Sequence, residues 1–330
     1  MMIDIHAHFF PPVSEEQAMR LNPKTAPWLK IKDDGKTGNI ILDGRDFRPV
    51  YDALWSAERR VEELDKQNVD LQIICATPVL FAYAEPISEK VVEWNRLMND
   101  LAIEMCNYAP NRLKTLAQVP LQDIDEACKE LSRAKNIGHI GVQIGNHVGL
   151  KNLDDEGILT FLHHCADENM PVFIHPWDMM GKERMPKWML QWLVSMPAET
   201  QLGVLSLILS GALEKLPESL KICFAHGGGS FPYLIGRVDN AWQHRDIVRE
   251  DCPKLPSSYL NRVWVDSAVF DPLALRFLVD KMGADKIMLG SDAPFPLGEK
   301  KIGYLVKNSG LAVDIQQNIL HGNAKQFFNL

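Results

Sequence analysis

The sequence IDIHAHF at residues 3–9 decides the class of fold. Its apolar and β-branched residues predict a strand whose successive side chains point to opposite faces. His6 and His8 are two residues apart, so both imidazoles lie on the same side of that strand. Two imidazoles on one side form a chelating pair by geometry, although a His-x-His pair alone is a weak signal for a metal site.

Seven further apolar runs follow along the chain, and longer amphipathic segments separate them. This alternation indicates βα units around a parallel sheet, and eight such units close an α/β (β/α)8 TIM barrel. The predicted strands are 3–9, 70–77, 113–119, 140–144, 172–175, 220–226, 263–268 and 286–291. The predicted helices are 56–68, 88–108, 123–135, 155–169, 197–213, 230–242, 272–282 and 313–328.

Length favours a single domain over residues 1–330, because α/β barrels of this size form one core. The connection after the first strand, about residues 10–55, is too long for a simple loop. It is predicted to be a small β insertion, with a strand pair around residues 35–47. A second long connection, residues 176–196, also follows the carboxyl end of a strand, the face on which barrel enzymes carry their sites.

The composition excludes several classes of function. Lys and Arg total 35 against 43 Asp and Glu, and like charges form no long run, so nothing is shaped for nucleic acid or anionic lipid. The amino terminus lacks a basic targeting region, and the longest apolar stretch, residues 202–213, is too short to span a bilayer. Six cysteines without a CxxC pair suit reduced core thiols. We therefore expect a cytoplasmic protein without nucleic-acid or membrane partners.

Three other strand ends carry one ionisable residue each. His175 ends the fifth strand, His226 ends the sixth and Asp292 follows the eighth. Burying such groups at one end of a barrel is costly unless they share a cation or a hydrogen-bond network. Three imidazoles and a carboxylate suit Zn²⁺, with Fe²⁺ or Co²⁺ as substitutes.

The sequence favours one metal per chain. Two-metal barrels of this type need a bridging ligand, commonly a modified Lys at the end of strand four, and residues 139–145 of this chain contain no Lys. His226 then remains as a nearby base that can take or return the proton of a metal-activated water. The expected zinc ligands are His6, His8, His175 and Asp292.

The remaining histidines are assigned to structure or to solvent, with one exception. His147 lies just past strand four on the functional face, so contact with substrate stays open for it. Trp188 and Phe295 flank ligand positions and are candidates for apolar pocket walls. The residues with a structural or solvent assignment are His139, His163, His164, His244 and His321.

Longer motifs carry a resemblance to a known family. Four of them are HAHFFP at 6–11, HPWDMM at 175–180, HGGGSFP at 226–232 and GSDAPFPLGE at 290–299. Others are FRPVY at 47–51, CATPV at 75–79, LAQVPLQD at 116–123, QIGNH at 143–147, QWLVSMPAET at 191–200 and GRVDNAW at 236–242. Together they resemble the amidohydrolase superfamily and, more narrowly, its α-amino-β-carboxymuconate-ε-semialdehyde decarboxylase (ACMSD) branch. One departure is Ala293, where the family has a Tyr; this changes the pocket beside a metal ligand.

The resemblance assigns roles to residues. His6, His8, His175 and Asp292 match the family's zinc ligands, with Asp292 also in the catalytic set. His226 matches its proton-transferring histidine, and Arg48 resembles its substrate-binding arginine. Arg237 and Arg245 match arginines that reach into the neighbouring subunit's site, which implies a homodimer.

The resemblance also implies a reaction. It is the zinc-dependent, non-oxidative decarboxylation of 2-amino-3-carboxymuconate 6-semialdehyde to 2-aminomuconate 6-semialdehyde, in tryptophan (kynurenine) or nitrobenzoate-type catabolism. No pyridoxal-phosphate lysine, thiamine site or flavin motif is visible in the sequence, so the metal must carry the chemistry. Arginines suit such a substrate because a guanidinium binds a carboxylate through two hydrogen bonds.

Three alternatives stay open. The first is decarboxylation of a related hydroxybenzoate-type acid. The second is a metal-dependent hydrolase, because the same activated water attacks an ester, amide or lactone carbonyl. The third is a zinc-stabilised protein without turnover, which would have a closed metal site and no need for His226.

Overall fold

A computed structural model describes residues 1–22 and 24–330. The chain forms two compact units. Unit 1 comprises residues 1–143 and 291–303, and unit 2 comprises residues 144–290 and 304–330. The single domain expected over residues 1–330 stays a prediction.

Unit 1 contains a parallel sheet in the order β1-β5-β6. Its strands are β1 (Ile3–Phe9), β5 (Leu71–Ala76) and β6 (Leu113–Thr115). Every residue of β1 and β5 is buried, as is typical of parallel sheets covered on both faces. Parallel bridges join Ala117 to Val142 and Ala7 to Ala293, so the segment that carries Asp292 lies along β1.

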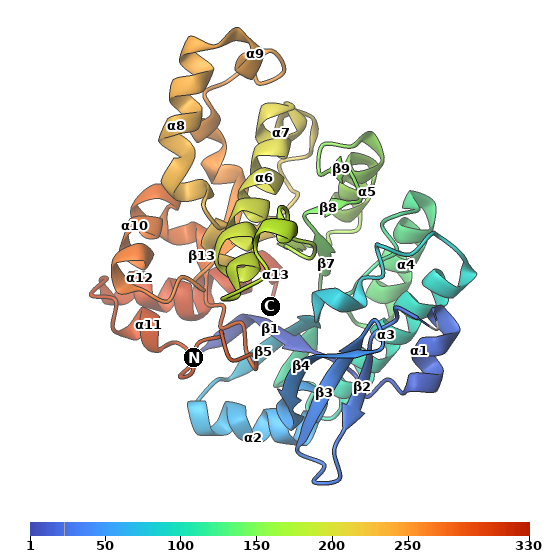
Figure 1. The fold of residues 1–330 in the computed structure, drawn as a ribbon. Helices are drawn as coiled ribbons and strands as arrows, with labels where there is room; N and C mark the ends of the chain where they lie inside the picture. Colours follow the sequence, from blue (N-terminus) through green and yellow to red (C-terminus); the bar gives the residue numbers. More distant parts are fainter. Residues whose placement is uncertain (23) are drawn as a thin grey trace. The chain divides into compact units, whose positions relative to one another are not determined.

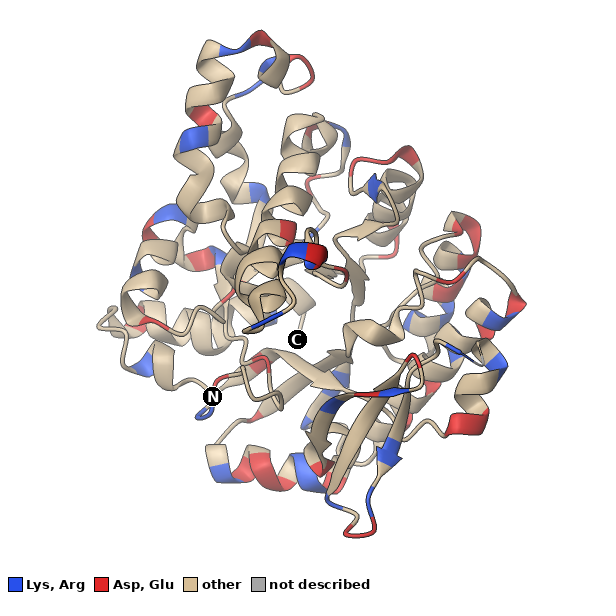
Figure 2. Cartoon of the chain, in the orientation of Figure 1, with Lys and Arg blue, Asp and Glu red and all other residues tan. Residues whose placement is uncertain are grey.

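Three helices of unit 1 follow the predicted pattern: α2 (Ala57–Gln67), α3 (Glu89–Asn107) and α4 (Ile124–Ile137) (Figure 1). The Ser56 and Asp123 side chains accept hydrogen bonds from the first turns of α2 and α4, as capping residues do. Acidic and basic residues are interspersed on the exposed face of α2, where they form ion pairs (Figure 2). The helices predicted at 56–68, 88–108 and 123–135 are therefore present, with ends within a few residues of the predicted ones.

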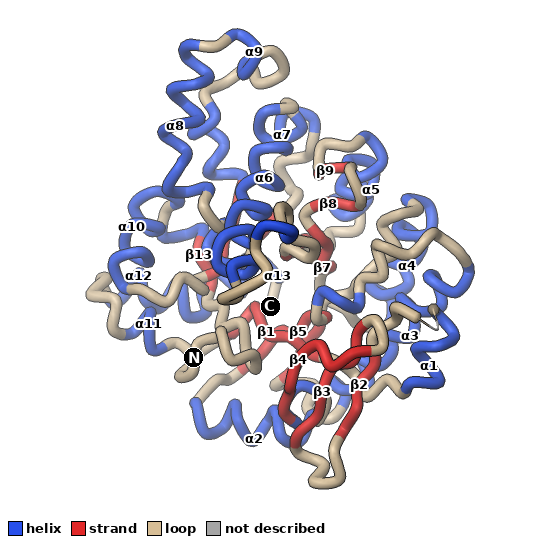
Figure 3. The backbone as a smooth tube through the Cα atoms, in the orientation of Figure 1, coloured by secondary structure: helices blue, strands red, loops and turns tan. Residues whose placement is uncertain are grey.

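The insertion after β1 contains more structure than predicted. It has a helix, α1 (Glu15–Leu21), and an antiparallel sheet of three strands, β2 (Trp28–Ile31), β3 (Thr37–Leu42) and β4 (Arg45–Tyr51) (Figure 3). The expected strand pair corresponds to β3 and β4, and β2 was missed. Asp43 and Gly44 form the β3–β4 turn with φ of 52° and 67°, the left-handed values that a two-residue hairpin favours.

A second sheet has the order β13-β12-β11-β10-β7, and its strands β10 to β13 pair in parallel within unit 2. Its strands are β7 (Val142–Gly145), β10 (Val172–His175), β11 (Ile222–Phe224), β12 (Val263–Asp266) and β13 (Ile287–Met288). All eight predicted strands therefore occur, several of them shorter than predicted. A small hairpin of β8 (His147–Val148) and β9 (Lys151–Asn152) follows β7.

The helices of unit 2 lie between these strands and after β13 (Figures 1 and 3). They are α5 (Glu156–Asp167), α6 (Met196–Leu209), α7 (Ala212–Lys215), α8 (Phe231–His244), α9 (Asp246–Arg249), α10 (Pro272–Met282), α11 (Tyr304–Lys307), α12 (Val313–Gln317) and α13 (Asn323–Phe328). Two segments are π-helical, η4 (Gln191–Ser195) and η8 (Asn318–Gly322). Short 3-10 turns are η1 (Asp52–Leu54), η2 (Pro78–Leu80), η3 (Lys182–Arg184), η5 (His226–Gly228), η6 (Pro256–Arg262) and η7 (Ala284–Lys286).

Two predicted helices are interrupted. The predicted helix 197–213 breaks at Gly211, whose φ is 71° and whose missing side chain leaves room for the carbonyl oxygen of Asp251. The predicted helix 313–328 contains the π-helical segment η8. Neither interruption involves a proline.

The continuous helical run Gln191–Leu209 is longer than the apolar part of residues 202–213 that it contains. Among the described residues it is the one helix that is long and apolar enough, by length and composition, to cross a membrane. This is weak evidence, since core helices pass the same test. Val204, Leu207 and Ile208 are buried in unit 2, and Gly203 packs closely against Phe224, which identifies α6 as a core helix of that unit.

The cysteines match the expectation for a reduced core. All six are free, and five are buried. Burial raises the pKa of the Cys75 and Cys106 thiols to about 12, so both remain protonated and unreactive at neutral pH.

Candidate functional site

The two histidines of β1 face each other, as their spacing predicts. His6 Nε2 and His8 Nε2 are 3.1 Å apart, and both residues are buried. His8 Nδ1 lies 3.3 Å from the carbonyl oxygen of Ala76. A hydrogen bond from Nδ1 to that oxygen leaves the Nε2 lone pair of His8 available to a metal.

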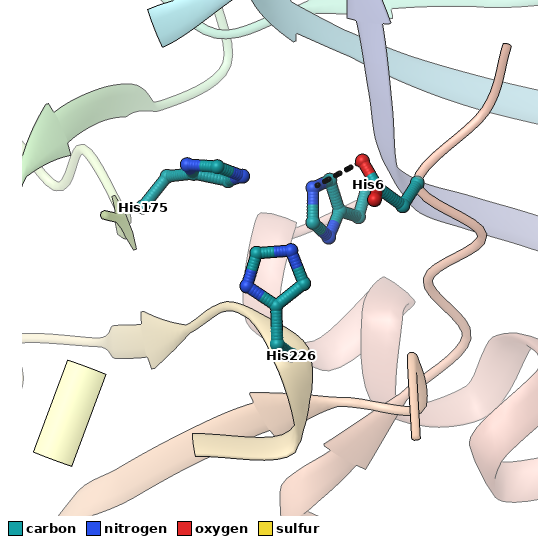
Figure 4. A group of neighbouring side chains, drawn as sticks. His6, His175 and His226 are labelled. Atoms are coloured by element: carbon teal, nitrogen blue, oxygen red, sulfur yellow. Dashed lines mark ion pairs between the residues drawn. The ribbon is translucent and has the colours of Figure 1, made fainter. Parts of the chain in front are cut away.

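Asp292 adds a carboxylate oxygen to this pair. Its Oδ1 lies 3.1 Å from His8 Nε2 and 3.6 Å from His6 Nε2, the pair drawn with a dashed line in Figure 4. Backbone bonds fix the arrangement, since Asp292 N donates to His6 O at 2.8 Å and His8 N donates to Ala293 O at 2.7 Å. Tetrahedral ligands about 2.0–2.1 Å from zinc lie roughly 3.3 Å from one another, so these three atoms fit one small cation.

The backbone of Asp292 is strained. Its φ is 58°, a left-handed value that a residue with a side chain adopts only when its surroundings enforce it. Such outliers concentrate at functional sites, because the strain is retained where a side chain must be aimed. Here it directs the carboxylate toward the β1 histidines.

Arg48 on β4 lies beside the ligands of unit 1. Its guanidinium carbon is 4.7 Å from the ring centroid of Phe295, and that ring is 5.3 Å from the ring of His8. Burial lowers the pKa of Arg48, and the charge of Asp292 acts in the opposite direction. Both predicted substrate contacts of unit 1, Arg48 and Phe295, are therefore brought next to the predicted ligands His8 and Asp292.

In unit 2, His175 and His226 form a second pair. Their rings are 4.9 Å apart and meet edge to face (Figure 4). His175 is the last residue of β10, and its Nδ1 lies 2.7 Å from Pro176 O. That hydrogen bond orients the ring and leaves Nε2 as the nitrogen able to bind a metal.

The turn that carries His226 depends on a residue missed in the sequence. The Asp266 carboxylate accepts hydrogen bonds from His226 N at 3.0 Å, Gly227 N at 2.8 Å and Ala268 N at 3.0 Å. Asp266 is fully buried at the end of β12. An acidic residue that ends a fully apolar strand was the available signal for it.

This turn also explains the three glycines after His226. His226 has a φ of 56°, and Gly227 has a φ of 61°. A Cβ at Gly227 would collide with the Val269 side chain, and one at Gly229 would collide with the carbonyl oxygen of Pro197. Gly227 and Gly229 are thus required by close packing against Val269 and Pro197.

A second missed residue, Glu199, holds the segment after His175. Its carboxylate accepts hydrogen bonds from Asn146 Nδ2 at 2.7 Å and Met180 N at 2.8 Å. Trp177 in the same segment donates to His147 O at 2.7 Å. His147 therefore contacts the segment that follows β10.

Three predicted substrate residues of unit 2 are not enclosed by their own chain. Trp188 is 79% exposed, with a φ of 58°. Arg237 is exposed on α8, and Arg245 is exposed between α8 and α9. One chain alone therefore does not build a pocket around them.

His139 has the structural role predicted for it. It is buried, and its Nε2 lies 3.2 Å from Asn99 O. Burial lowers the pKa of His139 to about 4. A neutral, buried imidazole of this kind belongs to the core.

Sequence comparisons relate the whole chain to known proteins. Residues 3–330 match the family model described as Amidohydrolase. The 2-amino-3-carboxymuconate-6-semialdehyde decarboxylase of Dictyostelium discoideum is 37% identical, with 100% of this chain and 92% of the relative covered. The enzyme of the same name from Caenorhabditis elegans is 30% identical, with 96% of this chain and 95% of the relative covered.

One solved structure adds a comparison of folds. The dihydroxybenzoic acid decarboxylase of Polaromonas sp. JS666, with bound manganese and 2-nitroresorcinol, has a TM-score of 0.76 and 22% identity. The match covers 100% of this chain and 97% of that chain. The likeness confirms the predicted fold class.

Proposed function

The chain belongs to the amidohydrolase family, and from that premise we propose that it decarboxylates 2-amino-3-carboxymuconate 6-semialdehyde to 2-aminomuconate 6-semialdehyde. The observation that carries the proposal is the full-length identity of 37% and 30% to two enzymes named for this substrate. The geometry of unit 1 supports it, because Arg48 places a cation for a carboxylated substrate beside His8 and Asp292. The chain is accordingly a carboxy-lyase that acts without oxidation.

The metal of this enzyme is proposed to be one zinc ion per chain. The proposed ligands are His6, His8, His175 and Asp292, of which His6, His8 and Asp292 lie together in unit 1. The two nitrogens and one oxygen already grouped in unit 1 form the borderline donor set that zinc prefers. Bound there, the ion supplies a Lewis acid that makes water a nucleophile at neutral pH.

The proton of the reaction is assigned to His226. The carbon that loses CO₂ must gain one proton, and an imidazole can deliver and recover it near neutral pH. Asp266 holds the backbone of His226 and Gly227 through charge-assisted hydrogen bonds, which fixes the backbone position from which the His226 side chain projects. His226 is accordingly proposed as the acid and base, and Asp266 as the residue that positions it.

Arg48 is proposed to bind a carboxylate that stays on the product. Its guanidinium rests over Phe295, which limits its rotation while its N–H groups remain able to donate. Since both residues belong to unit 1, this contact needs no partner chain.

Arg237 and Arg245 are proposed to act in a neighbouring subunit of a homodimer. Tyr233, one helical turn before Arg237, is 80% exposed, and Gly236 faces open space. An aromatic, a glycine and an arginine on one exposed part of α8 suit contact with another protein surface. A two-fold dimer would present this surface twice and supply two arginines to each site.

The test is turnover with defined substrates. Protein carrying one equivalent of zinc is mixed with freshly generated 2-amino-3-carboxymuconate 6-semialdehyde, and the loss of its near-ultraviolet absorbance is followed. We expect rapid loss with release of CO₂, and slow or no reaction with 2,6-dihydroxybenzoate in a parallel assay. Faster turnover of the dihydroxybenzoate, or hydrolysis of an ester without CO₂ release, would contradict the proposed substrate.

A further inference from the structure

We propose that Asp4, Ser291, Gln72 and Arg60 form a buried positioning network that holds the β1 histidines and Asp292 at metal-binding distance. This inference rests on the metal site proposed above and concerns how tightly that site binds. All four residues lie in unit 1, as do His6, His8 and Asp292. None of the four was recognised from the sequence.

Asp4 is the centre of the network. It is fully buried, and its Oδ1 accepts hydrogen bonds from Ser291 N at 3.0 Å and His6 N at 3.3 Å. Its Oδ2 accepts from Ser291 Oγ at 2.6 Å and Gln72 Nε2 at 2.8 Å. One carboxylate thus joins the strand that carries His6 to the residue that precedes Asp292.

An irregularity in β1 explains why this carboxylate is needed. The register of β1 against β5 shifts between Asp4 and Ala7, because Asp4 pairs with Gln72 whereas Ala7 pairs with Ile74. Such a bulge leaves one residue without its ladder partner and re-aims a neighbouring side chain, and bulges are common beside active sites. His6 lies inside the bulge, and Asp4 Oδ1 accepts from its backbone N–H.

Arg60 extends the network from α2 to the other ligand. It is buried, and it donates to His8 O at 2.5 Å and to Gln72 Oε1 at 2.8 Å. Gln72 therefore connects the Arg60 cation with the Asp4 anion through its amide. The carbonyl of one ligand and the backbone N–H of the other are held by the same four side chains.

A network of buried charges is an expensive way to stabilise a sheet, because apolar residues of similar size do so at least as well. The network does, however, fix the backbone position of a proposed metal ligand. Ser291 and Asp292 are adjacent, so the two Asp4–Ser291 bonds fix the start of the strained Asp292 backbone. Hydrogen bonds behind metal ligands commonly change metal affinity by about 10- to 100-fold.

The test uses Asp4→Asn, which keeps the size of the side chain and replaces one acceptor oxygen by a donor. At least one of the four donors around Asp4 then faces an N–H group. Zinc affinity is measured by competition with a chromophoric chelator, and the visible absorption of the Co²⁺-loaded protein reports ligand geometry. We expect the zinc Kd to rise about 10- to 100-fold and the Co²⁺ bands to shift.

Glu130→Gln is the matched control. Glu130 is also a buried carboxylate of unit 1, and it accepts hydrogen bonds from Asn99 at 2.6 Å and from Arg133 at 2.8 Å. The control is expected to lose stability in urea while keeping the wild-type zinc Kd and Co²⁺ spectrum. Ser291→Ala, which removes only one hydroxyl, covers the case in which Asp4→Asn does not fold, and its Kd should rise several-fold.

The outcomes separate this inference from the proposed function. A wild-type chain that binds no zinc would overturn the proposed function and this network with it. A wild type that binds zinc, with an unchanged Kd and Co²⁺ spectrum in the folded Asp4→Asn and Ser291→Ala proteins, would overturn the network alone. Equal loss of affinity in Glu130→Gln would also overturn it, because a general loss of stability would then explain the effect.

Discussion

Asp266→Asn tests whether the turn that carries His226 is held by one carboxylate. The substitution keeps the size of the side chain but leaves one oxygen in place of two. If the amide oxygen keeps the Gly227 and Ala268 bonds of 2.8 and 3.0 Å, the amide N–H₂ faces the N–H of His226. The change therefore removes one charge-assisted hydrogen bond and weakens two.

The expected loss follows from these three bonds. A hydrogen bond to a charged group contributes about 1.5–3 kcal/mol and a neutral one about 0.5–1.5 kcal/mol. Losing one and weakening two gives a decrease in the free energy of unfolding of about 3 to 5 kcal/mol. The kcat should fall at least about tenfold, because a proton donor displaced by even 1 Å is poorly placed.

The assay is urea unfolding of the metal-free chain, followed by steady-state kinetics of the metal-loaded chain. Asp271→Asn is the control, since Asp271 also accepts two backbone bonds, from Leu273 and Ala274, at the start of α10. Asn caps helices as well as Asp does, so this control should change stability by less than about 0.5 kcal/mol. If Asp266→Asn changes stability and kcat no more than the control does, the assigned role of Asp266 is wrong.

Four further predictions concern single residues. Arg48→Met should raise KM about 30- to 100-fold with a smaller effect on kcat, and Arg48→Lys should recover only part of the loss, because a lysine cannot bind a carboxylate through a planar fork; equal KM in both variants and wild type would contradict this. His226→Ala should keep its metal and lose turnover by orders of magnitude, whereas His175→Ala should lose the metal in elemental analysis; an empty site in His226→Ala would make that residue a ligand. The pKa of His139 is about 4 in the folded chain against 6.5 in the unfolded chain. The contribution of the neutral His139 ring to the free energy of unfolding is therefore complete above pH 6.5 and is lost as pH falls toward 4. The free energy of unfolding, measured in urea, should fall between pH 7 and pH 4 by about 3 kcal/mol less in His139→Gln than in the wild type. An equal fall in both proteins would refute this prediction. Co-expressed Arg237→Ala and His226→Ala chains should recover about one quarter of wild-type activity if half of the dimers are mixed; no recovery in a verified mixed dimer would place Arg237 in its own chain's site or on the surface.

The sequence predicted elements whose causes are local. The strand at 172–175 and the helix Pro272–Met282 have the predicted bounds. A capping aspartate, a proline in the first turn and a following glycine mark the ends of that helix. Such signals need no knowledge of distant residues.

The missed elements depend on tertiary contacts. Strand β2 has only four residues and exists through its pairing with β3. The break at Gly211 reflects the approach of Asp251, forty residues later in the chain. Propensity cannot reveal such contacts, because the partner is unknown before the fold is known.

The same distinction applies to the site. Histidines at strand ends are conspicuous in the sequence, and the structure places His6 with His8 and His175 with His226. The residues that hold them were missed, because Asp4 and Asp266 act through partners 287 and 40 positions away in the chain. An isolated acidic residue inside an apolar strand gives little indication of such a partner.

A metal titration read by CO₂ release tests whether the chain is a decarboxylase with one zinc site. Metal-free protein receives increasing zinc, and CO₂ formed from 2-amino-3-carboxymuconate 6-semialdehyde is measured at each step. A decarboxylase with one zinc site per chain predicts no CO₂ without metal and a linear rise that ends at one equivalent, with one CO₂ for each substrate consumed. Full activity in the metal-free protein, a plateau at two equivalents, or substrate consumption without CO₂ would contradict it.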